Sequence, residues 1–100
     1  MKFLIISKTK DIFLTLPPER RMELLNGALA YMDKYRKAGN CKELYWMPGW
    51  SRVVVIWEAE SGEEAARQVT ENPITPYTDM ESYALSDWDA YVKALMEARR

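Results

Sequence analysis

Residues 52–59 read RVVVIWEA, and this stretch carries the strongest strand signal in the chain. β-Branched and aromatic residues are enriched in strands, where alternate side chains point to opposite sides. One face of this strand therefore carries Val53, Val55 and Trp57, and the other carries Val54 and Ile56. A strand with one solvated face alternates apolar and polar residues. Because both faces are apolar here, the stretch predicts a sheet that is covered on both sides.

The patterns on either side of this strand place it within a single α+β domain over residues 1–100. In chain order they predict a strand at 3–7, a helix at 18–38, strands at 44–47 and 52–59, a helix capped by Ser61 that runs to Glu71, a strand at 78–85 and a last helix from Ser86. This order is the ferredoxin-like βαββαβ arrangement with an added C-terminal helix. The two prolines within residues 73–77 predict an extended, rigid loop before the fourth strand.

Two of the predicted helices have a one-sided apolar pattern. The first helix carries a stripe of Met22, Leu25, Leu29 and Met32. The last helix carries a stripe of Trp88, Tyr91, Val92, Leu95 and Met96. We expect the first stripe to face the core, and the second to pack in the core or against a second subunit.

The apolar second face of the sheet needs a cover. Helices joined to a ferredoxin-like sheet pack on one side of it, and the strand at 3–7 is also apolar on both faces. A homodimer in which two sheets face each other and enclose a barrel would cover the second face. The alternative is that the last helix folds back over this face within the monomer.

Composition excludes several classes of function. The chain has 100 residues, a net charge of −1 and a sequence pI of about 5.5, so it has no cationic surplus and we expect no nucleic-acid partner. Histidine is absent and Cys41 is the only cysteine, which excludes an intrachain disulfide, most zinc sites and Ser-His or Cys-His catalysis. We therefore expect no metal and no cofactor. The apolar runs are too short for a membrane span or a signal peptide, which predicts a cytoplasmic location.

Strand alternation also selects the candidate site residues. If Val53, Val55 and Trp57 face the helices, the opposite face carries Arg52, Val54, Ile56 and Glu58, with Tyr45, Met47, Asp79, Glu81 and Tyr83 from neighbouring strands. A face that mixes apolar walls with a few polar groups is typical of a ligand pocket. A register error of one residue would reverse every one of these assignments.

These side chains suit acid–base chemistry on a small molecule. Glu81 and Glu58 are the candidate general bases, and Tyr45 and Tyr83 are the candidate hydrogen-bond donors to a developing enolate. The candidate substrate-binding residues are Arg52, which could clamp a carboxylate, together with Trp50, Met47 and Ile56. The structural alternatives are exposed strand-end charges, an ion pair of Arg52 with a glutamate, tyrosines at the edge of the core, and a subunit contact at Trp50.

Parts of the chain resemble the muconolactone isomerase family. The resemblance covers residues 1–85 and rests on Pro17–Asn40, on Leu44–Gly49 and most specifically on the loop Asn-Pro-Ile-Thr-Pro-Tyr-Thr-Asp at 72–79. It implies a dimeric α+β barrel, which some members assemble into larger rings. It also aligns Ala28 with a glutamate of the isomerase, and Glu43 and Trp50 with two histidines. The resemblance therefore supports the fold more than the muconolactone reaction.

Three functions follow as hypotheses. The first is a cofactor-independent isomerase or cyclase acting on a small, partly apolar molecule. The second is a cofactor-free monooxygenase with a mainly aromatic pocket. The third is a binding or assembly protein without catalysis, which the missing histidines favour.

Overall fold

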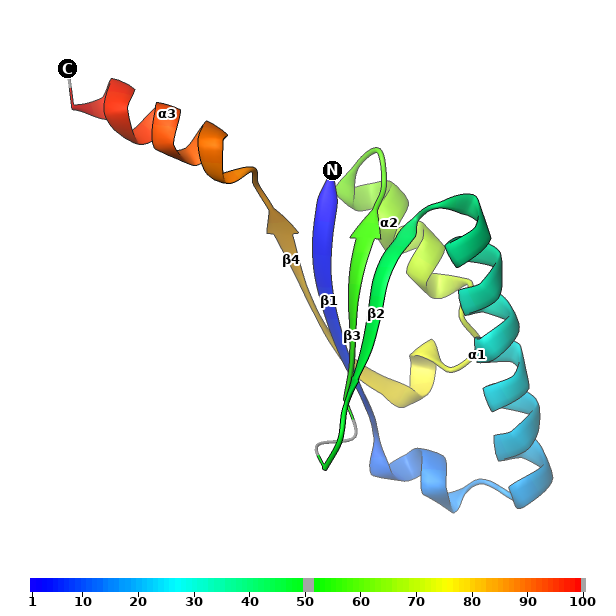
Figure 1. Ribbon diagram of the computed structural model, residues 1–100. Coiled ribbons are helices and arrows are strands. Elements are labelled where there is room, and N and C mark those ends of the chain that lie inside the picture. Colours follow the sequence, from blue (N-terminus) through cyan, green and yellow to red (C-terminus); the bar gives the residue numbers. More distant parts are fainter. Residues whose placement is uncertain (50–51, 100) are drawn as a thin grey trace.

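Four antiparallel strands form one sheet in the order β2-β3-β1-β4, with two helices packed on one side of it (Figure 1). The computed structural model describes residues 1–49 and 52–99. The elements are β1 (Lys2–Thr9), η1 (Asp11–Thr15), α1 (Pro18–Ala38), β2 (Cys41–Met47), β3 (Arg52–Glu58), α2 (Gly62–Thr70), η2 (Thr75–Tyr77), β4 (Thr78–Leu85) and α3 (Trp88–Ala98). The predicted α+β, ferredoxin-like order is confirmed, with β1 and β2 longer than expected and α3 starting later.

The register separates the side chains of the sheet into two faces. Leu4 lies opposite Ile56 on one side and Tyr83 on the other, and Ile6 lies opposite Val54 and Glu81. We call this side the open face, because α1 and α2 cover the other side. The helix-covered face carries Phe3, Ile5, Val55 and Trp57, all of which are buried. This division agrees with the face assignment made from strand alternation.

An aromatic cluster joins α1 to the helix-covered face. Trp57 is only 2% exposed, and its ring stacks with that of Tyr31 at 6.1 Å between centroids and 9° between planes. Tyr35 packs against both rings, at 5.0 and 5.1 Å. The indole N–H of Trp57 donates to Oε1 of Gln68 in α2 at 2.7 Å. This hydrogen bond gives the indole N–H a partner, which a buried tryptophan needs because water cannot reach it.

The predicted core stripe of α1 is right in part: Met32 packs against the core, but the buried side of the helix is centred about one position away from the predicted stripe. The buried residues are Leu24, Tyr31 and Tyr35, whereas Met22 and Leu29 are 59% and 66% exposed. The large tyrosine rings bury more area against the β3 indole than the aliphatic side chains would, which sets the rotation of α1. The exposed aliphatic residues form a second apolar face on this helix.

Local interactions define three helix ends, and the predicted Ser61 cap of α2 is confirmed. Ser61 caps α2, with its hydroxyl oxygen accepting from the backbone N–H of Glu64 at 3.1 Å. Gly39 ends α1 in the left-handed conformation, at a φ of 89°, where glycine has no Cβ penalty. Asp87 caps α3 and accepts from the N–H of Ala90, so that helix begins one residue beyond its aspartate.

The loop before β4 was predicted to be extended, and this prediction is wrong. Residues 72–77 instead make a turn that leads into the short helix η2. The carboxamide oxygen of Asn72 accepts from the N–H of Ile74 at 3.1 Å, and the N–H of Tyr77 reaches the carbonyl of Ile74. This hydrogen bond forms an Asx turn, which bends the backbone despite the preference of proline-containing segments for an extended conformation.

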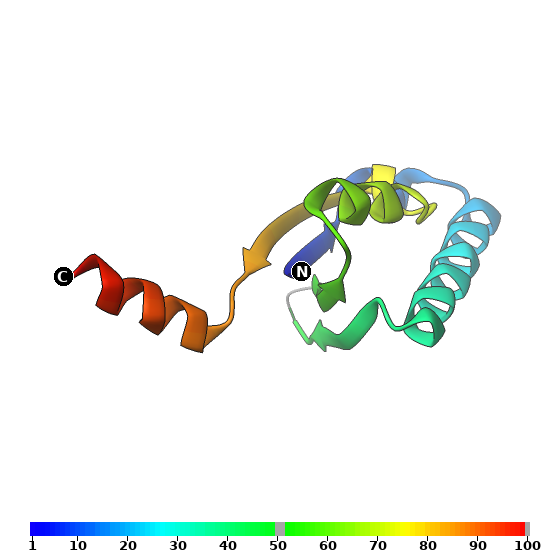
Figure 2. The ribbon, with the colours of Figure 1, turned by 90° about the horizontal axis from the view of Figure 1, so that it is seen from above.

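The last helix stands away from the rest of the protein. Figures 1 and 2 show α3 extending from the end of β4, on the side away from α1. All of its described residues are exposed, including the whole apolar stripe. The radius of gyration is 16.4 Å, against about 13 Å for a compact chain of this length. The alternative in which α3 covers the open face of its own subunit is therefore excluded. None of the helices within residues 1–49 and 52–99 combines the length and apolarity that crossing a membrane requires.

Candidate functional site

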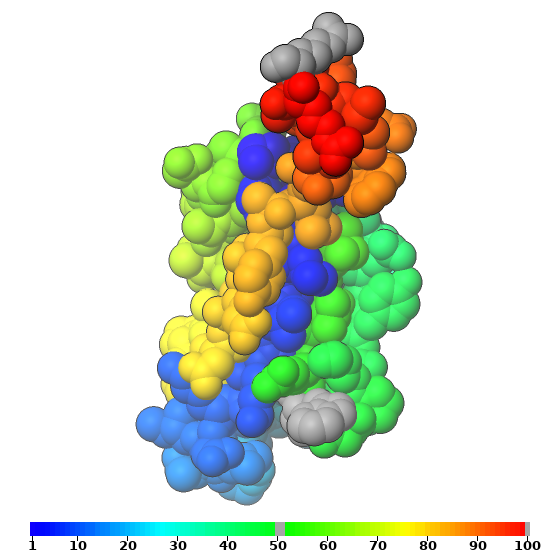
Figure 3. Space-filling view, turned by 90° about the vertical axis from the view of Figure 1, so that its left-hand side faces the viewer, coloured from blue at the N-terminus to red at the C-terminus, as the bar shows by residue number. Residues whose placement is uncertain are grey.

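The open face has an apolar centre flanked by a tyrosine–glutamate pair at each edge. Figure 3 looks onto this face, with β4 in orange, β1 in blue and the other two strands in green beside it. At the β4 edge, the hydroxyl of Tyr83 donates to Oε2 of Glu81 at 2.8 Å. At the β2 edge, the hydroxyl of Tyr45 donates to Oε1 of Glu43, also at 2.8 Å. Each hydrogen bond to a carboxylate raises the pKa of its tyrosine.

The two pairs lie too far apart to share one small ligand within a subunit. Three strand spacings separate β2 from β4, which amounts to about 14 Å. Tyr45 therefore does not join Glu81 and Tyr83, although the sequence argument grouped all three.

Glu58, at the end of β3, lies two strand spacings and four residues away from Glu81 in the register. It lies opposite Lys2 in the register, and its Oε1 is 3.6 Å from the amino nitrogen of Met1. Its other oxygen, Oε2, is buried without a hydrogen-bond partner among the described residues. Within one subunit, the two candidate bases, Glu58 and Glu81, therefore do not share one site.

Arg52 lies two strand spacings and two residues from Glu81 in the register. Both side chains line a shallow hollow of about 350 Å³ on the open face, together with Ile6, Lys8 and Asp79. In the register, Lys8 lies between Arg52 and Asp79, two residues along β1 from Ile6, which lies opposite Glu81. Lys10 stands 3.8 Å from Asp79 at the same end of β4. The lining of the hollow thus carries two cationic side chains, Arg52 and Lys8, and two carboxylates, Asp79 and Glu81.

The remaining substrate-binding candidates have different surroundings. Met47 lies opposite Arg52 at the end of β2 and is half-buried. Ile56 lies near the centre of the open face, between Leu4 and Glu43. Trp50 lies outside the described residues. The roles assigned to all eight candidates stay predictions.

A second cavity, which sequence reasoning missed, lies on the helix-covered side of the sheet. It measures about 240 Å³, and we call it the inner cavity. The helix α1 contributes Leu25, Ala28, Tyr31 and Met32; the sheet contributes Ile5, Ser7, Thr9, Val53, Val55, Trp57, Thr78 and Met80; the remaining lining is Val69, Asn72, Ile74 and Thr75. None of these side chains carries a charge at neutral pH. A signal was present in the sequence: Ser7 and Thr9 continue the core-facing alternation of Phe3 and Ile5 with small polar residues.

Tyr31 contributes a phenol to the lining of this cavity. Burial and the nearby Glu71 carboxylate raise the pKa of the Tyr31 phenol well above its ordinary value. The phenol is therefore protonated throughout the neutral range and acts as a hydrogen-bond donor. No general acid or base for neutral pH lines the inner cavity.

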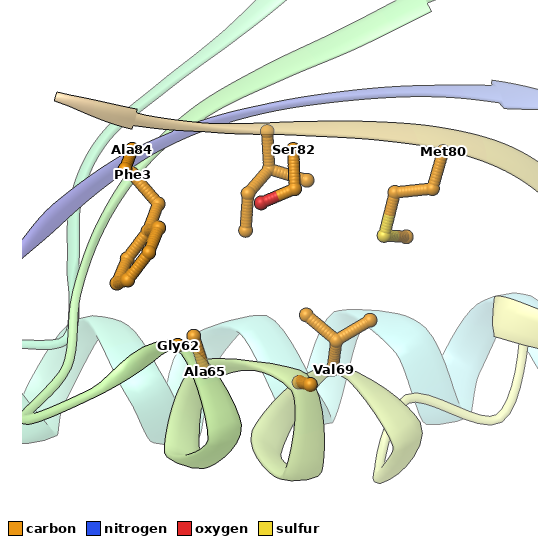
Figure 4. A pocket seen from close by; sticks show the side chains of 9 residues that line it. Phe3, Gly62, Ala65, Val69, Met80, Ser82 and Ala84 are labelled. Carbon is orange, nitrogen blue, oxygen red and sulfur yellow. The ribbon is translucent and has the colours of Figure 1, made fainter.

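An apolar groove between α2 and β4 adjoins the inner cavity. Figure 4 shows Met80, Ser82 and Ala84 directed from β4 toward Ala65 and Val69 of α2. The groove measures about 350 Å³ and shares Met80 and Val69 with the lining of the inner cavity.

Two of the positions that the resemblance aligned with isomerase residues lie on opposite sides of the sheet, and the third, Trp50, lies outside the described residues. Ala28 lines the inner cavity, whereas Glu43 lies on the open face. These two positions therefore cannot form one site within a single subunit.

Comparison with known proteins identifies the family. A solved structure described as the crystal structure of muconolactone isomerase at 3.3 Å resolution matches with a TM-score of 0.76. The match covers 87% of this chain and 90% of that chain at 20% sequence identity, so it shows a shared fold. No curated protein sequence matches this chain. The model of the family described as muconolactone delta-isomerase matches residues 1–90. The chain therefore belongs to the muconolactone delta-isomerase family.

Proposed function

We propose that this member of the family is a homodimeric, cofactor-independent isomerase or cyclase that acts on a small molecule carrying a carboxylate. The observation that carries the proposal is the hollow on the open face, whose lining includes Arg52, Lys8 and Glu81. A guanidinium group can bind a carboxylate with two parallel hydrogen bonds, and a second cation adds to the attraction. A base next to an anchored anion is the arrangement that abstraction of a carbon-bound proton requires.

In this mechanism Glu81 moves the proton and Tyr83 assists it. The Glu81 carboxylate takes a proton from a carbon next to the substrate carbonyl, and the electron pair of the broken C–H bond forms an enolate. Tyr83, which donates to Glu81 in the structure, can turn its hydroxyl to the enolate oxygen. Glu81 then returns the proton to another carbon, so that the double bond moves and no oxidant or reductant is consumed. Arg52 holds the substrate carboxylate throughout.

A second copy of the chain completes the site by covering it. The centre of the open face consists of Leu4, Ile6, Val54 and Ile56, which remain partly accessible, and the stripe of α3 is fully unpartnered. Two unpartnered apolar surfaces on one chain are typical of an interface between subunits. A second sheet over the open face would exclude water from the hollow, which strengthens the interaction between Arg52 and an anionic substrate.

Deuterium exchange tests the proposal without knowledge of the natural substrate. Small enolisable lactones and keto acids, each with a carboxylate, are incubated with the protein in D₂O and followed by proton NMR. We expect the wild type to catalyse exchange for at least one compound, and Glu81→Gln to slow that exchange about 10²–10⁴-fold. Glu58→Gln is the matched control, because Glu58 lies outside the hollow. Equal exchange by the wild type and Glu81→Gln would contradict the mechanism.

The uncharged inner cavity favours a second candidate function. A cavity lined by Tyr31, Trp57 and aliphatic residues suits a cofactor-free monooxygenase, whose phenolic substrate supplies the electrons for oxygen, or a binding protein without catalysis. Oxygen consumption with a phenolic substrate separates these two candidates from each other. Its dependence on Tyr31 rather than Glu81 would separate the monooxygenase from the isomerase.

A further inference from the structure

We infer that each site around Glu81 is shared between two subunits, with Tyr45 of the partner subunit donating the hydrogen bond that positions the Glu81 carboxylate. The inference rests on the proposed function and deepens it, because it names what the second copy adds to the hollow besides cover. It also gives a role to the Tyr45–Glu43 pair, which lies about 14 Å from β4 within one subunit.

The open face carries the same pattern at both of its edges. Two rows of four residues cross its centre in the order β2-β3-β1-β4: Glu43, Ile56, Leu4 and Tyr83 in one row, and Tyr45, Val54, Ile6 and Glu81 in the next. Each row therefore ends in a tyrosine on one edge and a glutamate on the other, with two aliphatic residues between them. Tyr45 and Glu81 end the same row on opposite edges, as do Tyr83 and Glu43.

A second copy turned about a two-fold axis parallel to the strands brings these ends together. The rotation keeps the rows aligned and places β2 of each subunit beside β4 of the other. Tyr45 of the partner subunit then lies in the row of Glu81, and the partner's Glu43 lies in the row of Tyr83. Aliphatic side chains face each other across the centre. Both β2 and β4 are edge strands, so the same placement offers their unpaired backbone groups a partner.

A two-fold axis at right angles to the strands fits the proposed site less well. It would place β4 beside β4 of the partner and bring the partner's Glu58 opposite Arg52, because these two residues end the β3 row of the open face. A protein carboxylate would then neutralise the guanidinium group. The parallel axis instead brings Lys8 of the partner subunit opposite Arg52, and an anionic substrate would neutralise both cations.

The partner's Tyr45 replaces a hydrogen bond that Glu81 loses in the proposed mechanism. In the structure, the hydroxyl of Tyr83 donates to Oε2 of Glu81 at 2.8 Å, which leaves Oε1 for a second donor. When Tyr83 turns toward the enolate oxygen, that bond is broken, and the hydroxyl of the partner's Tyr45 then holds the carboxylate in place. Tyr45 can change partners, because its own hydrogen bond to Glu43 is exposed to solvent.

Cross-linking of two cysteine variants tests the arrangement without any substrate. Tyr45→Cys and Glu81→Cys chains are coexpressed and treated with a bis-maleimide that spans about 10 Å, the distance between stacked sheets. We expect covalent dimers from the mixture, and none from either variant alone or from the wild type, whose Cys41 is buried. Covalent dimers of Glu81→Cys alone would indicate the other axis and overturn the inference, as would a mixture without covalent dimers.

Deuterium exchange tests whether the hydroxyl of Tyr45 acts on Glu81. Tyr45→Phe removes only this hydroxyl and should lower the exchange rate at saturating substrate about tenfold, with the half-saturating concentration unchanged. Arg52→Lys is the matched comparison, because loss of the two parallel hydrogen bonds should raise the half-saturating concentration. Exchange by Tyr45→Phe that equals the wild type would overturn the inference.

A mixture of two deficient variants shows whether the two residues come from different subunits. Coexpressed Tyr45→Phe and Glu81→Gln should regain about a quarter of the wild-type exchange, because about half of the dimers are mixed and each mixed dimer holds one unaltered site. A mixture no more active than the average of its components would overturn the inference. Absence of exchange in the wild type would instead refute the proposed function, and the cross-links would still decide the arrangement of the subunits.

Discussion

Substitution of Leu95 by aspartate should separate the subunits without unfolding them. Leu95 lies in the apolar stripe of α3 and is 42% exposed, and no residue of α3 is buried within its own subunit. The monomer therefore loses almost no packing in Leu95→Asp. In the proposed dimer, by contrast, the carboxylate would lie in an interface formed by Trp88, Tyr91 and their neighbours on the stripe.

The size of the effect follows from the exposed fraction. Full burial of a leucine is worth about 1.5–3 kcal/mol, so covering the exposed part contributes about 1 kcal/mol per subunit. An aspartate forced into the interface adds a desolvation penalty of several kcal/mol. Because both subunits carry the change, and about 1.4 kcal/mol corresponds to a factor of ten, the dimer dissociation constant should rise at least about 100-fold.

Sedimentation velocity over a concentration series measures this change. We expect the wild type to sediment as a dimer and Leu95→Asp to shift to monomer at micromolar concentration, with unchanged helicity by circular dichroism. Lys93→Asp is the matched control, because it introduces the same carboxylate on α3 outside the stripe. A Leu95→Asp protein that remains as dimeric as the wild type would refute the role of α3, as would an equal loss in Lys93→Asp.

Further predictions concern the stability of the fold. Gly27→Ala should lower the free energy of unfolding by about 1–3 kcal/mol, because the new Cβ would lie 2.7 Å from Cγ of Pro73, whereas Gly62→Ala, with nothing within 4 Å, should not destabilise; thermal unfolding of the two variants checks this. Gln68→Leu should cost about 1–3 kcal/mol in denaturant unfolding, because the buried indole N–H loses its acceptor. Tyr31 has a raised pKa in the folded state, so the unfolded phenol ionises first and stability should fall as pH rises above about 10. Tyr31→Phe should make that fall shallower by up to about 1.4 kcal/mol per pH unit, and an unchanged pH profile would contradict the assignment.

The two faces of the sheet could be predicted from the sequence because they depend on a local pattern with a fixed period. Strand side chains alternate with a period of two, so the apolar run of β3 assigned both faces once Trp57 was placed against the helices. The same argument put Arg52 and Glu81 on one face, and the register agrees. Ser61 and Gly39 marked helix ends through local hydrogen bonds and backbone conformation, which depend little on the rest of the fold.

The incorrect predictions concern features for which the sequence allows two arrangements. Tertiary packing selects one of them. The helix α1 has one apolar face with Met22 and Leu29 and another with Tyr31 and Tyr35, and only contact with Trp57 selects the second. The prediction that Tyr45 lies near Glu81 and Tyr83 failed for a related reason. Alternation says which face a residue occupies, but the strand order, which placed Tyr45 about 14 Å from β4, depends on long-range pairing.

The small polar residues Ser7 and Thr9 are the only sequence signal for the inner cavity, because its volume depends on how two surfaces fit together in the folded chain. Ser7 and Ala28 look unremarkable separately, and they matter because α1 and β1 leave space between them. The charged side chains of the hollow lie on the open face, and the uncharged lining of the inner cavity lies on the helix-covered face. A single layer of strands therefore separates two different chemical environments. A binding experiment that compares anionic with neutral molecules would therefore indicate which face of the sheet binds the ligand.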